Sequence, residues 1–151
     1  MEECELSCRI ISKLPYSRPF LFVDRILSVD DDAIEGLYYF REDEFFYTGH
    51  FVNRPVTPGV ILVECMGQIG LVSHAIFLEK LYLSHDSLEI HLCDFKAEFF
   101  RTVTPNTNVL VRGRVMFMRA GKLRSEIQMI EEKSEDLIAV IEGSCIIRKD
   151  G

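Results

Sequence analysis

The hydrophobic and polar positions of the chain follow two different patterns, and each pattern predicts a different element. After Thr57, apolar residues occupy almost every position over several helical turns, which indicates a helix surrounded by protein. We expect this helix to begin at Pro58 or Gly59 and to run to about Lys80, because proline is favoured at a first helical position. Thr57 is its predicted N-cap.

The apolar run carries interruptions that bear on its environment. Glu64, Gln68 and His74 lie within it, so a buried helix of a soluble protein is favoured over a transmembrane span. Gly67 and Gly70 lower the intrinsic helix propensity. We expect these glycines to permit the close approach of a sheet or a second helix.

Alternating apolar and polar residues, separated by turn-forming residues, predict strands on both sides of this helix. The predicted strands are residues 20–29, 33–40, 88–101, 109–118, 122–131 and 137–148. Residues 1–12 could form a short strand or a short helix. Residues 14–19 indicate a turn or a single helical turn, and residues 41–48 indicate a loop with a short helix. The order predicts one α+β domain over residues 1–151, in which an antiparallel sheet wraps one long helix.

The composition favours a soluble globular protein and limits its partners. The chain has 151 residues, of which 48% are hydrophobic and 27% charged, and a net charge of −7 argues against nucleic acid as a partner. Between Lys96 and Arg124, however, seven basic residues and a single acidic one, Glu98, give a local charge of +6. Two interpretations of this basic segment stay open: it is a docking surface for an anionic partner, or it consists of solvated strand faces.

The cysteines and the beginning of the chain indicate a cytoplasmic protein. Five cysteines, an odd number, form no pair of metal-binding motifs, so we expect free thiols and no metal site. The first residues are acidic where a signal peptide would be basic. We therefore expect a cytoplasmic location without membrane attachment.

His50 and Glu64 are the candidate catalytic pair. His50 lies in a loop before the helix, and a neutral imidazole accepts a proton near neutral pH. Glu64 is the single carboxyl of the apolar run, and apolar surroundings favour the neutral acid, which donates a proton. Gly59 is the candidate oxyanion donor, because backbone N–H groups at a helix N-terminus are unpaired. A base, an acid and an oxyanion site together suit the elimination of water from a 3-hydroxyacyl thioester.

Other readings of these residues stay open at this point. Gln68, one turn after Glu64, either orients that carboxyl or bonds a nearby backbone group. Arg54 or Arg101 is an alternative partner that would make Glu64 part of an ion pair. The remaining histidines lack a comparable context, and we expect no catalytic role for His74, His85 and His91.

A series of different short motifs follows in order along most of the chain. These motifs are Leu14-Pro15, Pro19-Phe20-Leu21, Val23-Asp24-Arg25, Gly49-His50-Phe51, Arg54-Pro55-Val56, Pro58-Gly59-Val60 and Glu64. Together they resemble the 3-hydroxyacyl-[acyl-carrier-protein] dehydratases of the FabZ type. The resemblance implies a hot-dog fold, and a homodimer that is commonly assembled into a trimer of dimers. It also implies that His50 of one protomer meets Glu64 of the other.

The resemblance further implies a substrate and a partner. The Gly59 N–H would polarise the thioester carbonyl of an acyl chain delivered on the phosphopantetheine arm of an acyl carrier protein. That carrier is acidic, which favours a docking role for the basic segment, and no metal or organic cofactor is expected. A related branch that also isomerises the double bond has aspartate in place of Glu64, so dehydration alone is expected here.

The chain also departs from the family pattern. Val52-Asn53 stands where Pro-Gly is usual, Tyr16 stands where histidine is common, and Thr102 and Asn106 replace a proline and a glycine. These departures leave open whether the pathway is fatty acid synthesis or a polyketide or aryl-polyene pathway. Two other functions also stay open, a hot-dog thioesterase and a non-catalytic subunit that binds acyl carrier protein.

Overall fold

The computed structural model describes residues 2–150 of the chain. The elements follow in the order α1 (Glu3–Lys13), β1 (Arg25–Val29), β2 (Ala33–Phe40), α2 (Gly59–Gly67), a π-helical segment (Gln68–Ser73), α3 (His74–Leu78), a short 3-10 helix (Leu81–Leu83), β3 (Ser87–Phe99), β4 (Thr107–Arg119), β5 (Lys122–Glu131) and β6 (Leu137–Asp150). The strands form one antiparallel sheet in the order β1-β2-β4-β5-β6-β3.

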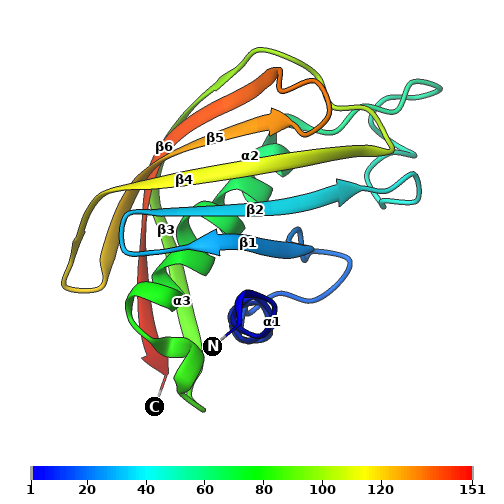
Figure 1. The fold of residues 1–151 in the computed structure, drawn as a ribbon. Helices are drawn as coiled ribbons and strands as arrows, with labels where there is room; N and C mark the ends of the chain where they lie inside the picture. Colours follow the sequence, from blue (N-terminus) through cyan, green and yellow to red (C-terminus); the bar gives the residue numbers. More distant parts are fainter. Residues whose placement is uncertain (1, 151) are drawn as a thin grey trace.

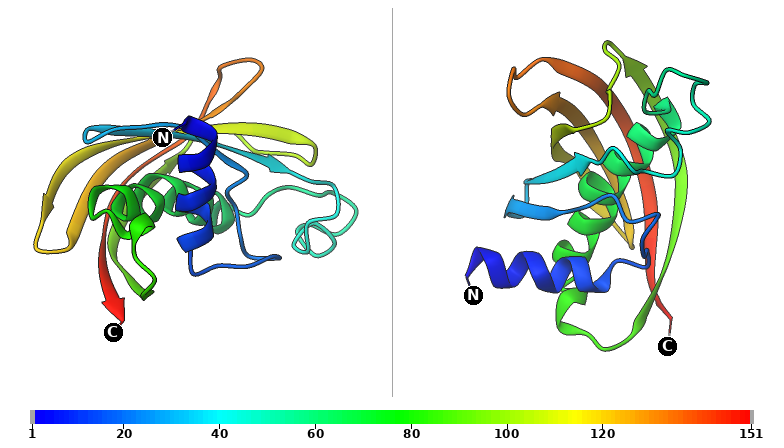
Figure 2. Two further views of the ribbon diagram at one scale, coloured as in Figure 1. Left: turned by 60° about the horizontal axis from the view of Figure 1, so that its bottom comes forward. Right: turned by 90° about the vertical axis from the view of Figure 1, so that its right-hand side faces the viewer.

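The sheet curves around a single long helix, as Figures 1 and 2 show. α2, the π-helical segment and α3 run on without a break and lie in the concave side of the sheet, while α1 packs near β1. The buried core lies between this helix and the inner face of the sheet, and it includes Met66, Ile69, Ile76, Ile127 and Ile141. This arrangement confirms the predicted hot-dog fold.

The long helix begins at Gly59, as predicted, but its N-cap is Pro58 and not Thr57. The Thr57 hydroxyl is instead hydrogen-bonded to the Tyr47 hydroxyl at 2.6 Å, so it is unavailable to the helix N-terminus. The stretch Gly59–Leu78 has the length and composition of a membrane span, yet 72% of it is buried within the fold. A core helix has these same properties.

Gly70 lets the helix approach the sheet closely, whereas Gly67 has no such role within the chain. A Cβ built on Gly70 would lie 2.6 Å from Cδ1 of Ile127 on β5, and one on Gly113 would lie 3.0 Å from the Gly70 Cα. Apart from the neighbouring backbone of the helix itself, none of the described residues lies within 4 Å of a Cβ on Gly67. The prediction of close approach is therefore confirmed for Gly70 and wrong for Gly67.

Several predicted element bounds differ from the structure for identifiable reasons. The strand predicted over residues 20–29 begins only at Arg25, because the Phe22 N–H donates to the Gln68 side chain and not to a neighbouring strand. Residues 41–48 form turns without the short helix that was predicted. The weakly patterned beginning is the helix α1, which buries Ser7 and Ile10.

Candidate active site

His50 lies in the loop that connects β2 to α2 and extends beyond the ends of the strands (Figure 1). Its backbone is held by two mutual hydrogen bonds between Phe51 and Arg54, and by the Val56 N–H, which donates to the His50 carbonyl at 2.9 Å. The end of the loop is bonded to the segment between β3 and β4, where the Thr57 N–H donates to the Val103 carbonyl at 2.8 Å. The His50–Phe51 peptide bond is cis.

The His50 ring is fixed in one tautomer. Its Nδ1 lies 2.8 Å from the carbonyl oxygen of Val56, and a carbonyl only accepts hydrogen bonds, so Nδ1 carries the proton. In the neutral ring the other nitrogen, Nε2, therefore has a free lone pair. A half-buried imidazole held in this way presents Nε2 as a base.

Glu64 lies on α2, half-buried, and is held by Gln68. Nε2 of Gln68 donates to Oε1 of Glu64 at 3.0 Å and also to the Phe20 carbonyl at 3.0 Å. The other end of the amide, Oε1, accepts from the Phe22 N–H at 2.8 Å. Both roles considered for Gln68 are thus present, because the same side chain bonds the carboxyl and ties the segment before β1 to the helix.

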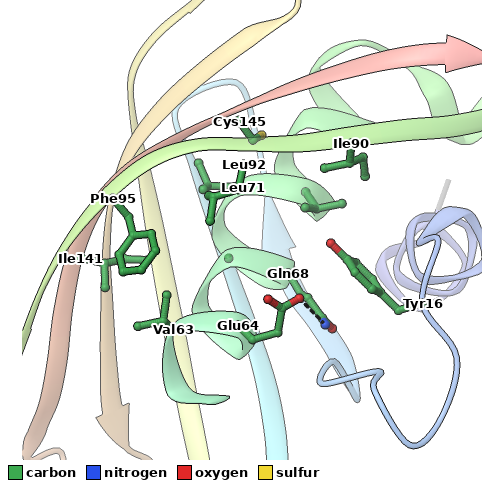
Figure 3. A pocket seen from close by; sticks show the side chains of 12 residues that line it. Tyr16, Val63, Glu64, Gln68, Leu71, Ile90, Leu92, Phe95, Ile141 and Cys145 are labelled. Atoms are coloured by element: carbon green, nitrogen blue, oxygen red, sulfur yellow. Dashed lines mark hydrogen bonds between the residues drawn. The ribbon is translucent and has the colours of Figure 1, made fainter. Parts of the chain in front are cut away.

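A pocket of about 190 Å³ opens beside Glu64, between the helix and strands β3 and β6 (Figure 3). Most of its lining is apolar, and it includes Leu71, Ile90, Leu92, Phe95 and Ile141. Tyr16 enters it from the segment that follows α1, and Cys145 enters it from β6. We refer to this cavity as the Glu64 pocket.

Burial raises the pKa of each of the two ionisable groups that share this pocket with Glu64. It raises the pKa of the Cys145 thiol to about 12. Burial, with smaller contributions from the charges of Glu64 and Cys145, also raises the pKa of Tyr16 well above its usual value. Both side chains are therefore neutral at physiological pH, and neither is a nucleophile there.

Gly59 presents unpaired backbone donors at the start of α2. Neither its N–H nor that of Val60 has an acceptor within residues 2–150. A Cβ built on Gly59 would lie 3.2 Å from the Phe99 ring of β3, so the residue here has to be small. This aromatic ring is half exposed and covers one side of the helix N-terminus.

Within a single chain, the structure does not bring the two predicted catalytic residues into one pocket. Among the described residues, those that line the Glu64 pocket come from the segment after α1, from the long helix, and from β3 and β6. His50 is not one of them, and its loop extends beyond the strands in Figure 1 and in the left view of Figure 2.

The alternative ion pairs for Glu64 are not formed. Arg101 pairs with Asp136, and in the part of the chain that the structure describes Arg54 makes no ion pair. Three residues of the basic segment have carboxylate partners: Arg101, Arg112 with Glu35, and Arg124 with Asp94 and Glu142. These pairs reduce the positive surface that the residue count predicted.

All five cysteines are free thiols, as predicted. Among residues 2–150, no group of three or more His, Cys, Asp or Glu side chains is arranged to hold a metal ion.

The chain is similar to proteins of known family. A family model described as a FabA-like domain matches residues 14–147. The 3-hydroxyacyl-[acyl-carrier-protein] dehydratase FabZ of Rickettsia felis is 35% identical over 114 residues, which are 74% of this chain and 76% of that protein. The FabZ of Herpetosiphon aurantiacus is 40% identical over 97 residues, which are 64% of this chain and 66% of that protein.

Two solved structures are similar in fold. The dehydratase heterocomplex ApeI:P from Xenorhabdus doucetiae matches with a TM-score of 0.75 at 10% identity, over 93% of this chain and 91% of that chain. A thioesterase from Haemophilus influenzae matches with a TM-score of 0.58 at 16% identity, over 83% and 78% of the two chains. At such low identity these likenesses show the fold alone.

Proposed function

The chain belongs to the FabA-like family and to its FabZ-type dehydratases, and from that membership we propose that it removes water from (3R)-3-hydroxyacyl-[acyl-carrier-protein]. The product is the trans-2-enoyl thioester, and the enzyme is a hydro-lyase whose residues 1–151 act as one dehydratase domain. The pathway is either fatty acid synthesis or a specialised pathway of the polyketide or aryl-polyene type. The departures at Tyr16 and Val52-Asn53 favour the specialised pathway.

The observation that carries this proposal is the fixed tautomer of His50. Because Nδ1 donates to Val56, Nε2 is the nitrogen available to remove the C2 proton of the substrate. The electron pair of the C2–H bond then forms the C2–C3 double bond through an enolate. The C3–O bond breaks, and its oxygen leaves as water with a proton from Glu64.

Three further groups support this chemistry. The unpaired Gly59 N–H donates to the thioester oxygen, where negative charge develops as the C2 proton leaves. Gln68 holds the Glu64 carboxyl toward the pocket through the hydrogen bond from its Nε2 to Glu64 Oε1, which is 3.0 Å long. The apolar lining of the Glu64 pocket receives the hydrocarbon chain beyond C3.

We also propose a homodimer in which the His50 loop of one protomer completes the Glu64 pocket of the other. β3 is an edge strand of 13 residues, which among residues 2–150 pairs with β6 alone and has Leu92, Phe95 and Phe99 half exposed. An edge strand presents unpaired backbone N–H and C=O groups with which another chain can pair, and the apolar side chains of β3 alternate with charged ones such as Glu89 and Lys96. Alternatively, three such dimers assemble into a hexamer.

The partner that delivers the substrate is an acyl carrier protein in the cytoplasm. The carrier protein docks on those residues of the basic segment that have no carboxylate partner. Lys96 and Arg114 are two of them, because they form no ion pair among the described residues. No cofactor takes part, since the three proton-transfer and oxyanion groups suffice for the elimination.

The test is turnover of 3-hydroxyacyl-[acyl-carrier-protein] by the pure protein, followed by intact mass spectrometry with a parallel assay for free thiol. Loss of one water with the thioester intact is the expected result. Released thiol would support a thioesterase instead. Binding of the carrier protein without any change of its mass would support a non-catalytic subunit.

A further inference from the structure

The Tyr16 hydroxyl lies in the Glu64 pocket without a protein partner. Figure 3 shows the ring entering the pocket from the segment after α1, with its hydroxyl end directed inward. Within residues 2–150, this hydroxyl forms no hydrogen bond, although the side chain is partly buried. By contrast, the buried Tyr47 and Tyr38 hydroxyls are bonded to Thr57 and Glu44.

The surroundings of this hydroxyl make an unpaired state costly once an acyl chain displaces the water that reaches it in the open pocket. The side chains of the pocket around it are mostly hydrocarbon, from Leu71, Val72, Ile90 and Leu92. A hydroxyl withdrawn from water into apolar surroundings is normally hydrogen-bonded, and an unbonded one is typical of a functional position. An alkyl chain in this pocket would displace water from Tyr16 and offer nothing in exchange.

The position of Tyr16 relates it to a particular part of the substrate. Glu64 protonates the C3 oxygen, so the chain beyond C3 continues past Glu64 into the pocket. Tyr16, Glu64 and Cys145 of β6 all line this pocket, so the phenol shares the cavity with the acid. Because the phenol stays protonated at physiological pH, it can donate a hydrogen bond there.

Resting on the proposed dehydratase function, we propose that Tyr16 is a specificity-determining residue whose hydroxyl bonds an oxygen atom carried by the acyl chain beyond C3. The preferred substrates are then 3-hydroxyacyl thioesters with a second oxygen function, such as a keto, hydroxyl or phenol group. Plain alkyl chains of the same length are poorer substrates, because they leave the Tyr16 hydroxyl unpaired.

The experiment compares pantetheine thioesters of one chain length that differ in a single oxygen. One 3-hydroxyacyl thioester has a plain alkyl chain, and the others carry one keto or hydroxyl group at successive carbons beyond C3. We expect the native protein to prefer one position of the oxygen over the plain chain by about tenfold or more in kcat/KM. Tyr16→Phe should remove this preference by slowing the oxygenated substrate more than the plain one.

The control is Tyr82→Phe. Tyr82 also forms no hydrogen bond among the described residues, but it stacks on Phe77 outside the Glu64 pocket, so this variant should keep the preference. The proposal is overturned if no oxygenated substrate is preferred. It is also overturned if Tyr16→Phe slows plain and oxygenated substrates equally, because that result indicates a general structural or catalytic role.

Binding of inert analogues separates this inference from the proposed function. Calorimetry with pantetheine amides of the same acyl chains measures the preference without turnover. If the native protein dehydrates every chain alike and binds every amide alike, the dehydratase stands and the role of Tyr16 fails. If nothing is dehydrated but the Tyr16-dependent preference persists in binding, the dehydratase fails and the role of Tyr16 in selecting the acyl chain stands.

Discussion

Nε2 of Gln68 donates a hydrogen bond to Oε1 of Glu64 at 3.0 Å, one helical turn earlier. The same amide bonds the backbone of Phe20 and Phe22, so it connects the candidate acid to the segment that leads from Tyr16 to β1. This buried glutamine therefore fixes the direction of a carboxyl that faces a mostly apolar pocket.

Gln68→Ala should affect both stability and activity. The change leaves the buried Phe22 N–H without an acceptor, which we expect to lower the free energy of unfolding by about 1–3 kcal/mol. It also frees the Glu64 carboxyl, so kcat should fall by about tenfold or more. Urea unfolding and steady-state kinetics measure the two effects. Gln128→Ala on the outer face of β5 is the control, and it should change stability by less than about 0.5 kcal/mol.

His50→Asn should abolish turnover but preserve the loop. The asparagine amide can replace Nδ1–H as a donor to the Val56 carbonyl, yet it has no lone pair that accepts a proton as Nε2 does. We expect kcat to fall by about 10²–10⁴ with an unchanged unfolding midpoint. Activity near the native level in this variant would remove His50 from the mechanism.

The two helix glycines should respond in opposite directions to alanine. Gly70→Ala places a methyl group 2.6 Å from Ile127, and we expect this overpacking to lower the free energy of unfolding by about 1–3 kcal/mol. Gly67→Ala meets nothing within 4 Å and should raise it by up to about 1 kcal/mol through helix propensity. Equal responses in chemical denaturation would contradict the close helix–sheet contact at Gly70.

His74 should make the fold less stable in mild acid. Its ring is fully buried with Nε2 bonded to the Asp30 carbonyl, and burial lowers its pKa below the usual value of 6.5 despite the nearby aspartates. Below about pH 6.5 the unfolded chain therefore binds more protons at this residue than the folded chain does. This contribution to stability is complete above that pH and is lost as the pH falls.

His74→Gln isolates this effect, because the glutamine amide can donate to the same carbonyl but does not titrate. Between pH 7 and pH 5.5 the native protein should lose stability relative to the variant, by at most about 1.4 kcal/mol per pH unit. Parallel pH profiles of the two proteins in urea unfolding would exclude His74 as the source of the acid sensitivity.

The parts of the fold that depend on local pattern were predictable from the sequence. β2 and β5 have the predicted bounds, because their alternation ends at clear turns, and the helix begins at Gly59 after Pro58. The strand predicted from Phe20 failed for a non-local reason. Phe22 is buried as its pattern indicates, but its backbone partner is the Gln68 side chain 46 residues away.

Candidate site residues could be named from the sequence, but their arrangement in space could not. The sequence indicates His50, Gly59, Glu64 and Gln68 as candidates, since each is a polar or small residue in an apolar or loop context. The pocket walls depend on the register of β3 and β6, which no local pattern specifies. For the same reason the exposed ring of Phe99 over the helix N-terminus could not be foreseen.

The most direct test of the central claim is subunit exchange between two inactive variants, His50→Asn and Glu64→Gln. An amide at position 64 cannot protonate the leaving hydroxyl, so each variant alone should be inactive. If His50 and Glu64 act across a two-fold interface, each mixed dimer contains one intact site. Random exchange of equal amounts should then restore about a quarter of the native dehydration rate. Absence of recovery, with mixed dimers verified by native mass spectrometry, would contradict a site shared between His50 and Glu64 of different protomers.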